Sequence, residues 1–294
     1  MAIAKRIFFF VLVNILVMVS VSIVTSAVCM YLYGTPYPPS GSLIPYAIWA
    51  GIWGMGGAFI SLLLSKTMAK HMMGVKIIDP QTRGPEKELV ELVHGLARKA
   101  RLRKMPEVGI YQSPEMNAFA TGPSKSNSLV AVSSGLLNQM NRSQLEGVLG
   151  HEVAHIANGD MVTLTLIQGV INAFVLFFSR IIASVIASQF ERNRWMIEFA
   201  LYIVLQIAFS LMGSIVVAYF SRIREYRADK GGARYSSREN MISALQALAN
   251  GPQFEPQKED NFAAFKISSG AKVMALFRTH PPLQDRIARL QKGY

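Results

Sequence analysis

The chain has 294 residues, of which 51% are hydrophobic and only 16% are charged. Soluble domains average about 25% charged residues, so this composition excludes a disordered chain and indicates that apolar residues gather in long segments. The single cysteine, Cys29, excludes an internal disulfide and a zinc site built from cysteines. Any metal site must therefore use carboxylates and the five histidines.

The net charge of +12 is distributed beside the apolar segments. It does not form a basic stripe interleaved with aromatic residues, which is the pattern typical of nucleic-acid binding. We therefore expect a lipid bilayer as a partner and no nucleic acid.

Four apolar runs are each long enough to cross a bilayer, which takes about 20 residues. The first run is too long for a signal peptide and has no cleavage pattern, so we expect a retained anchor. Short spacings between small residues (Ala50, Gly54 and Ala58) favour close helix packing in the second run. The runs cover residues 7–33, 43–65, 161–187 and 196–220.

Charges at the ends of the runs indicate their orientation. The loop at 34–42 is uncharged, whereas Lys5 and Lys66 lie at the opposite ends of the first pair of runs. By the positive-inside rule, those ends are cytoplasmic. The second pair is less regular, because Arg180 lies inside the third run and Arg192 in the following loop. We expect four parts: a transmembrane hairpin (1–65), a cytoplasmic segment (66–160), a second hairpin (161–220) and a second cytoplasmic segment (221–294).

The two polar segments show helix and strand signals. Pro85 starts a predicted helix, and Asn141 with Gln144 forms a predicted capping box at the start of another. A further capping box is expected at 236–239, followed by a helix over 241–249, a loop at 250–270 and a last helix after Pro282. Three strands are predicted at 107–112, 117–122 and 128–133, with turns at Pro114 and at 122–124.

One motif carries specific chemistry. Residues 151–155 read HEVAH on the helix expected after Asn141. Histidines four apart lie on one helix face and can share a zinc ion, while Glu152 can reach the attacking water. A catalytic zinc has three protein ligands, and the second hairpin returns the chain to the face where Glu225 can be the third. Asp229 is the reserve ligand, or it holds a ligand imidazole in place. The simpler interpretations are two solvated histidines and an interfacial Glu225.

At these positions the chain resembles a known family. The segments HEVAHIANGD (151–160), SRIREYRAD (221–229) and THPP (279–282) are similar to the HtpX family of bacterial inner-membrane zinc metalloproteases, of the gluzincin type. NAFATG (117–122) resembles that family's strand before the zinc helix. The resemblance covers essentially the whole chain. The fold class expected is an α-helical integral membrane protein with a cytoplasmic α+β, zincin-like domain containing the HExxH helix and a small β-sheet.

The resemblance implies roles for individual residues. It makes His151, His155 and Glu225 the ligands of one Zn²⁺ per chain, with Glu152 as the catalytic base and Asp229 as the aspartate that supports a histidine. It also implies proteolytic quality control of membrane or unfolded proteins under stress at the inner membrane, alongside a membrane-embedded ATP-dependent protease.

Two parts of the site have weaker signals. His280 is favoured as a second donor to the oxyanion because its THPP setting matches the family, although it could be an ordinary residue before a helix. Arg224, Tyr226 and Arg286 are alternatives. Substrate is expected to add as a strand along Asn117, Ala118, Phe119 and Ala120, which could equally be a buried structural strand.

Two other functions compete with a general membrane protease. A prenyl-protein protease would share the ligands but would need a large intramembrane chamber built from more spans. A non-catalytic scaffold or transporter would keep the helices but would have no use for Glu152.

Overall fold

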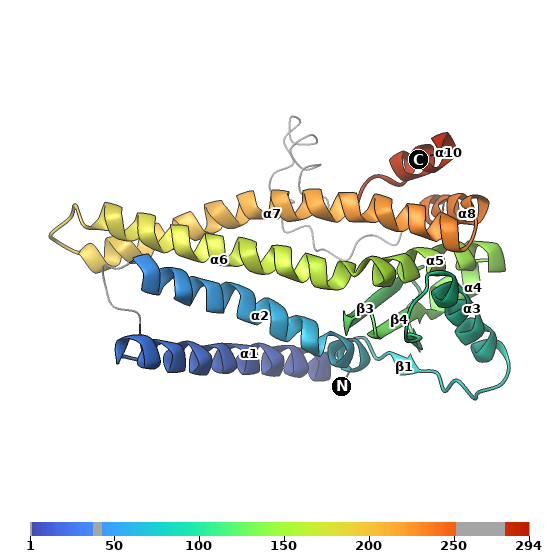
Figure 1. Cartoon of the computed structure of the whole chain (residues 1–294), viewed down its shortest axis with the longest axis horizontal. Coiled ribbons are helices and arrows are strands. Elements are labelled where there is room, and N and C mark those ends of the chain that lie inside the picture. The colour runs from blue at the N-terminus through green and yellow to red at the C-terminus, as the bar shows by residue number, and fades with distance from the viewer. Residues whose placement is uncertain (1, 38–42, 251–279, 294) are drawn as a thin grey trace. The chain divides into compact units, whose positions relative to one another are not determined.

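The computed structural model describes residues 2–37, 43–250 and 280–293, and in the first helix it describes the side chains of Ile15 and of residues 19–33. Except for Asn250, the predicted loop at 250–270 lies outside the described residues. The chain divides into two compact units (Figure 1). We call Met1–Leu62 with Thr163–Val217 the apolar unit, and Leu63–Val162 with Ala218–Tyr294 the mixed unit.

Four long helices supply the apolar unit: α1 (Ala2–Tyr33), α2 (Leu43–Met72), α6 (Asp160–Ala187) and α7 (Arg194–Tyr235). Three of them, α2, α6 and α7, are long and apolar enough to cross a membrane. In α1 the part that can be assessed, Val19–Tyr33, is a shorter apolar helix, and residues 7–14 of the first predicted run lie outside the described side chains. The fourth apolar run and the basic segment after it form one continuous helix of 42 residues.

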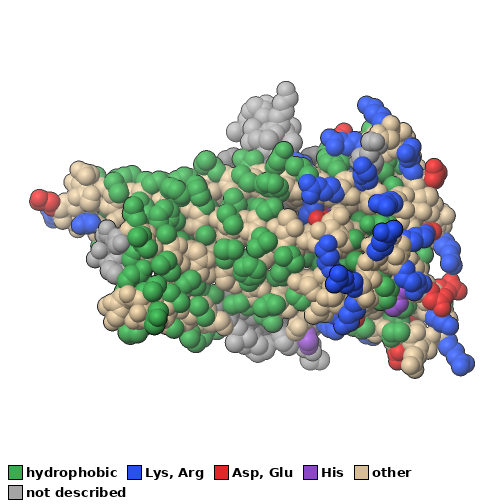
Figure 2. All heavy atoms as spheres, in the orientation of Figure 1, with side chains coloured by type: hydrophobic (Ala, Val, Ile, Leu, Met, Phe, Trp, Pro, Cys, Tyr) green, Lys and Arg blue, Asp and Glu red, His purple; other side chains and the backbone are tan. Residues whose placement is uncertain are grey.

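Large apolar side chains cover the outside of the apolar unit. Ile23, Val204 and Met212 are each more than 60% exposed. Hydrophobic side chains dominate the visible face of this unit, whereas Lys and Arg gather over the mixed unit (Figure 2). Exposed apolar surface on this scale is unfavourable in water and is what a lipid environment accommodates.

Small residues allow the helices of the apolar unit to approach closely, as predicted for α2. A Cβ atom at Gly54 would lie 2.2 Å from the backbone nitrogen of Ala173 in α6, and Ala50 is buried one turn earlier. A Cβ atom at Gly213 of α7 would lie 2.5 Å from the Ile171 side chain. Side chains larger than hydrogen at these glycines would force the helices apart.

The mixed unit contains a four-stranded sheet in the order β1-β2-β4-β3. Strand β2 is parallel to β4, and the other two pairs are antiparallel. Residues Leu129–Val132 of β4 are fully buried, as expected for a strand at the centre of the sheet. The bounds are Lys76–Ile77 (β1), Glu107–Tyr111 (β2), Ala118–Ser124 (β3) and Asn127–Ser133 (β4).

The structure confirms the three predicted strands but corrects one turn. Residues 122–124, predicted as a turn, belong to β3, and the chain reverses at Lys125 and Ser126 instead. The glycine at position 122 suggested a turn, but it has a different role. Gly122 has a positive φ of 142° and sits at an irregularity in the β3–β4 pairing. A Cβ atom there would lie 2.2 Å from the Asn127 carbonyl oxygen, so glycine marks a close backbone approach and not the turn itself. The two-residue strand β1 was not predicted.

Five helices accompany the sheet: α3 (Pro85–Lys99), α4 (Ser134–Gln139), α5 (Arg142–Asn158), α8 (Arg238–Asn250) and α10 (Leu283–Lys292). Helix α4 was not predicted. Pro85 occupies the first turn of α3, as predicted. The expected cap of α8 is shifted by one residue, because Ser237 Oγ accepts a hydrogen bond from the Asn240 amide, while Ser236 Oγ donates to the Gly232 carbonyl. The core lies between α3, α5 and the sheet around Val93, Val130, Leu149 and Val153.

Candidate metal centre

Helix α5 carries the HExxH motif, and both of its ends are capped. At its start the Asn141 side chain accepts from the Gln144 amide and the Gln144 side chain accepts from the Asn141 amide, which is the predicted capping box. At its end Gly159 adopts the left-handed conformation, with φ 75°. His151 and His155 lie one turn apart on this helix, where His151 is buried and Glu152 is half-buried.

Helix α7 passes close to α5 because both helices carry small residues at the contact. A Cβ atom at Gly232 would lie 3.0 Å from the His151 backbone nitrogen, and one at Gly231 would lie 2.5 Å from the Ala154 Cβ. This approach brings Glu225 and Asp229, one turn apart on α7, against the two histidines. Both carboxylates are fully buried, at 1% and 0% exposure.

Three side chains converge on one point. The Nε2 atoms of His151 and His155 are 3.1 Å apart, and they lie 3.5 and 3.4 Å from the two carboxylate oxygens of Glu225. One ligand atom from each residue lies within 4.8 Å of the others. Ligands on a tetrahedral zinc at about 2.0–2.1 Å would be roughly 3.3 Å apart, so this donor set fits zinc without rearrangement.

Each imidazole is oriented from its other nitrogen by a carboxylate. His151 Nδ1 is 2.9 Å from Asp229 Oδ1, and His155 Nδ1 is 2.6 Å from Asp160 Oδ2. Such contacts hold the ring so that Nε2 faces the metal position. Sequence reasoning nominated Asp229 but missed Asp160. The available signal was its place directly after Gly159, at the turn between α5 and α6.

Arg286 of α10 joins this network. Its Nε and NH2 groups donate to the two oxygens of Asp229 at 2.8 and 2.6 Å, and its NH1 lies 3.7 Å from Glu225 Oε2. The Arg286 side chain is 8% exposed. From the sequence, Arg286 was considered only as an oxyanion donor. In the structure it is chiefly the partner of the Asp229 carboxylate, and burying that charge without a partner would cost free energy.

The electrostatics follow from these contacts. Burial disfavours protonation of both histidines, but the neighbouring carboxylates outweigh it. Asp229 and Glu225 raise the pKa of His151, and Asp160 with Glu225 raises the pKa of His155 to about 9. Burial acts against ionisation of Glu225 and Asp229, yet the histidines hold the pKa of Glu225 far below its usual value, and Arg286 and His151 lower that of Asp229. The arrangement therefore favours a cation between the imidazoles.

The remaining predicted residues lie around this centre. His280 is largely exposed and its Nδ1 is 3.0 Å from Glu225 Oε2, while Arg224 is 3.8 Å from the other oxygen. Tyr226 stacks under Arg289, whose guanidinium carbon is 3.8 Å from the ring centre. Glu152 forms no hydrogen bond or ion pair with any residue in the described ranges. Among the described residues, no side chain competes with a water or a substrate for its carboxylate.

Strand β3, proposed for substrate, is at the edge of the sheet. It pairs with β4 on one side, and no described strand pairs with its other edge. Asn117 precedes the strand and is tied to Ser133 through its amide and its carbonyl group. Phe119 packs against the Tyr111 ring, at 5.7 Å between centres. The strand thus combines partly buried side chains with a backbone edge that no described strand occupies.

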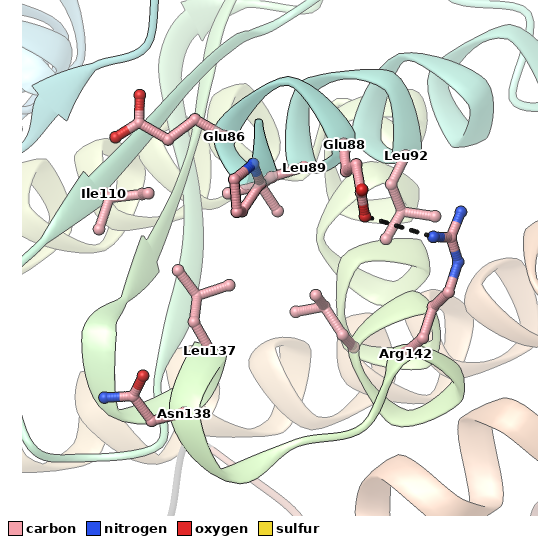
Figure 3. Close-up of a pocket in the computed structure, with 10 residues that line it drawn as sticks. Glu86, Glu88, Leu89, Leu92, Ile110, Leu137, Asn138 and Arg142 are labelled. Carbon is pink, nitrogen blue, oxygen red and sulfur yellow. Dashed lines mark ion pairs between the residues drawn. The ribbon is translucent and has the colours of Figure 1, made fainter. Parts of the chain in front are cut away.

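A separate pocket of about 460 Å³ lies between α3, α4 and the start of α5 (Figure 3). Its walls combine apolar side chains, such as Leu89 and Leu137, with polar ones, and the Glu88–Arg142 ion pair of 3.6 Å crosses one side. None of the residues that line it belongs to the His151–His155–Glu225 cluster.

Comparison with known proteins establishes the family. The sequence profile of peptidase family M48 matches residues 84–293. Protease HtpX homolog of Bacillus subtilis (strain 168) is 48% identical, and Protease HtpX of Shewanella sp. (strain W3-18-1) is 49% identical. In both cases the match covers 98% of this chain and 99% of the relative. The chain belongs to the HtpX family. It is a membrane metalloprotease of peptidase family M48, and the resemblance found in the sequence motifs is confirmed.

A solved structure shares the fold of this HtpX-family protease. The crystal structure of S. mikatae Ste24p matches with a TM-score of 0.61 at 14% sequence identity. The match covers 97% of this chain and 65% of that one. This metalloendopeptidase is thus mostly helical, with three candidate membrane helices and a small mixed sheet in the described residues. Membership of family M48 implies that it uses a metal.

Proposed function

We propose that His151, His155 and Glu225 bind one Zn²⁺ per chain. The observation that carries this proposal is the convergence of the two Nε2 atoms and the Glu225 carboxylate at 3.1–3.5 Å. Two histidines and a glutamate form one of the known ligand sets of catalytic zinc, and the fourth position is left for water or substrate.

When bound, zinc polarises the scissile carbonyl group and lowers the pKa of water to about 7. Glu152 accepts a proton from the attacking water and later delivers it to the leaving amine. Asp160 and Asp229 keep the imidazoles in the tautomer that presents Nε2. His280, exposed beside Glu225, donates a hydrogen bond to the developing oxyanion.

The substrate in this proposal is a polypeptide that adds to the open edge of β3, over Asn117, Ala118, Phe119 and Ala120. Main-chain hydrogen bonds to a strand edge recognise an extended peptide with little dependence on its sequence. This suits an enzyme that removes misfolded membrane proteins, and we assign this quality-control role, at the bacterial inner membrane, to the protein. Cooperation with a membrane ATP-dependent protease belongs to the same hypothesis.

The test is metal analysis of the detergent-solubilised protein beside Glu152→Gln and His151→Ala, with casein and a membrane protein as substrates. Glu152→Gln should keep stoichiometric zinc but lose about 10²–10⁴ in cleavage rate, because the amide preserves size and removes the base. His151→Ala should lose both metal and activity. Residual activity of Glu152→Gln within about threefold of wild type would contradict the mechanism.

The same assay separates the competing functions. Cleavage of a membrane protein that carries no prenyl group supports a general protease over a prenyl-protein protease.

A further inference from the structure

The apolar unit contains a charge that the proteolytic mechanism does not use. Arg180 lies in α6, 20 residues after Asp160, which is about 30 Å along a helix. This distance is about the thickness of the hydrocarbon core of a bilayer. Arg180 is seven residues before Ala187, the end of α6 that is joined to α7, and a long basic side chain near a helix end can extend to the headgroup level. An ionisable residue in a membrane helix is costly, and it usually marks a functional site.

Arg180 contacts a carboxylate and lies over an aromatic ring. Its NH2 group is 3.5 Å from Glu198 Oε1 of α7, and its guanidinium carbon is 5.9 Å from the centre of the Tyr46 ring. The Arg180 side chain is still 39% exposed, against 17% for Glu198. The pair is thus electrically neutral, and in the described part of the chain only the NH2 group of the guanidinium faces a carboxylate.

The pair stands beside a cavity of about 410 Å³ within the apolar unit. Arg180 is the only charged residue among those known to line it, and the others are aromatic. They come from α2, α7 and the segment after α1: Tyr37, Tyr46, Trp49, Phe199 and Tyr202. Tyr and Trp gather at the membrane interface because their rings are apolar and their tips are polar.

We propose that this cavity binds the headgroup of a zwitterionic phospholipid that carries a phosphate and a primary ammonium. The guanidinium donates paired hydrogen bonds to the phosphate. The ammonium pairs with Glu198 and lies over the aromatic rings, where cation–π attraction adds to binding. The acyl chains extend toward the middle of the two helices, along exposed apolar side chains such as Phe174 of α6 and Val204 of α7.

Charge balance favours a zwitterionic lipid over an anionic one. Because Arg180 and Glu198 already neutralise each other, an anionic headgroup would leave an uncompensated negative charge in a partly desolvated site. A headgroup with one charge of each sign keeps the site neutral. This proposal concerns the apolar unit and does not rest on the metal centre.

The experiment is native mass spectrometry of the full-length, zinc-loaded protein released from micelles that contain equal amounts of dioleoyl phosphatidylethanolamine and dioleoyl phosphatidylglycerol. Wild type should retain one phosphatidylethanolamine in preference to phosphatidylglycerol. Arg180→Gln should bind this lipid about tenfold more weakly. Arg180→Lys should bind with intermediate affinity, because it keeps the charge but not the paired donors.

Two further variants make the test specific. Glu198→Gln should still retain a phospholipid but should no longer prefer phosphatidylethanolamine over phosphatidylglycerol. Arg192→Gln, an exposed arginine in the turn between α6 and α7, is the matched control and should behave as wild type. Zinc content and melting temperature, measured on every variant, identify any that fails to fold.

Three results would overturn the proposal. The first is equal lipid retention by wild type and by a folded Arg180→Gln variant. The second is displacement of the bound lipid by millimolar inorganic phosphate, which would indicate a free-anion site. The third is an Arg180→Gln variant that retains lipid as wild type does but cleaves a membrane protein more slowly, with casein cleavage unchanged. That result would assign the cavity to a segment of the substrate.

Discussion

At the scale of single residues, the candidate metal centre consists of side chains whose directions are fixed by other side chains. Asp229 and Asp160 each hold one imidazole, and Arg286 holds Asp229 with two hydrogen bonds. Glu225 is the carboxylate that faces both Nε2 atoms. This difference in position predicts different consequences when each carboxylate is lost.

We predict that Glu225→Gln impairs zinc binding more than Asp229→Asn does. Loss of the Glu225 carboxylate leaves two imidazoles, which are too few to hold zinc firmly. Loss of a carboxylate that only orients an imidazole should weaken affinity by about 10–100-fold. Zinc titration of the metal-free proteins measures both effects. A larger loss in Asp229→Asn would exchange the two roles.

Asp160 should behave like Asp229, although the HExxH pattern does not include it. We expect Asp160→Ala to weaken zinc binding by about 10–100-fold, and Asp160→Asn by less, because the amide oxygen can still accept from His155 Nδ1. Glu91→Gln, an exposed carboxylate on α3, is the control. The absorption spectrum of the cobalt-substituted protein should also change in Asp160→Ala, and an unchanged spectrum and affinity would show that Asp160 does not orient the ligand.

At the scale of elements, the centre depends on how closely α5 packs against α7 and α8. Glycines on α5 and α7 remove the side chains that would separate these helices. Gly147 is the tightest contact with α8, because a Cβ atom there would lie 2.5 Å from the Asn240 carbonyl oxygen. A backbone atom cannot turn away as a flexible side chain can, so α8 itself would have to move.

We predict that Gly147→Ala lowers the melting temperature and the zinc affinity together. Overpacking of this kind costs about 1–3 kcal/mol. The matched control is Gly95→Ala in α3, where no atom lies within 4 Å of the added Cβ. That substitution should be neutral or should stabilise by about 0.5–1 kcal/mol, because alanine favours the helix. Thermal unfolding of both variants in the same detergent tests the contact, and equal melting temperatures would contradict it.

At the scale of the whole molecule, the two units differ in the surface that they present. The apolar unit exposes hydrophobic side chains, and the mixed unit exposes most of the described charges (Figure 2). Helix α7 contributes to both units, since it begins in the apolar unit and continues to Glu225 and Asp229. The candidate metal centre is thus built on a continuation of a candidate membrane helix.

We predict that the mixed unit faces the cytoplasm. Single cysteines at Ser126 and Gln291, in a chain with Cys29 replaced, should resist impermeant thiol reagents in intact cells and react after permeabilisation. A cysteine at Gln189, in the turn between α6 and α7, should react from outside and serves as the matched control. All three positions are exposed. Labelling of Ser126→Cys or Gln291→Cys in intact cells would reject this orientation.

Much of this protein could be predicted from the sequence because the deciding interactions are local. The length of the apolar runs, the i,i+4 spacing of His151 and His155 and the cap at Asn141 each depend on residues a few positions apart. What the tertiary structure decided depends on long-range approach: Arg286 meets Asp229 across 57 residues of sequence, and glycine contacts bring Glu225 to the histidines. Asp160 is near in sequence, but the left-handed turn at Gly159 determines where its carboxylate points. Spacing rules describe one helix at a time, so a contact made across a turn or between two helices becomes visible only when the chain has folded.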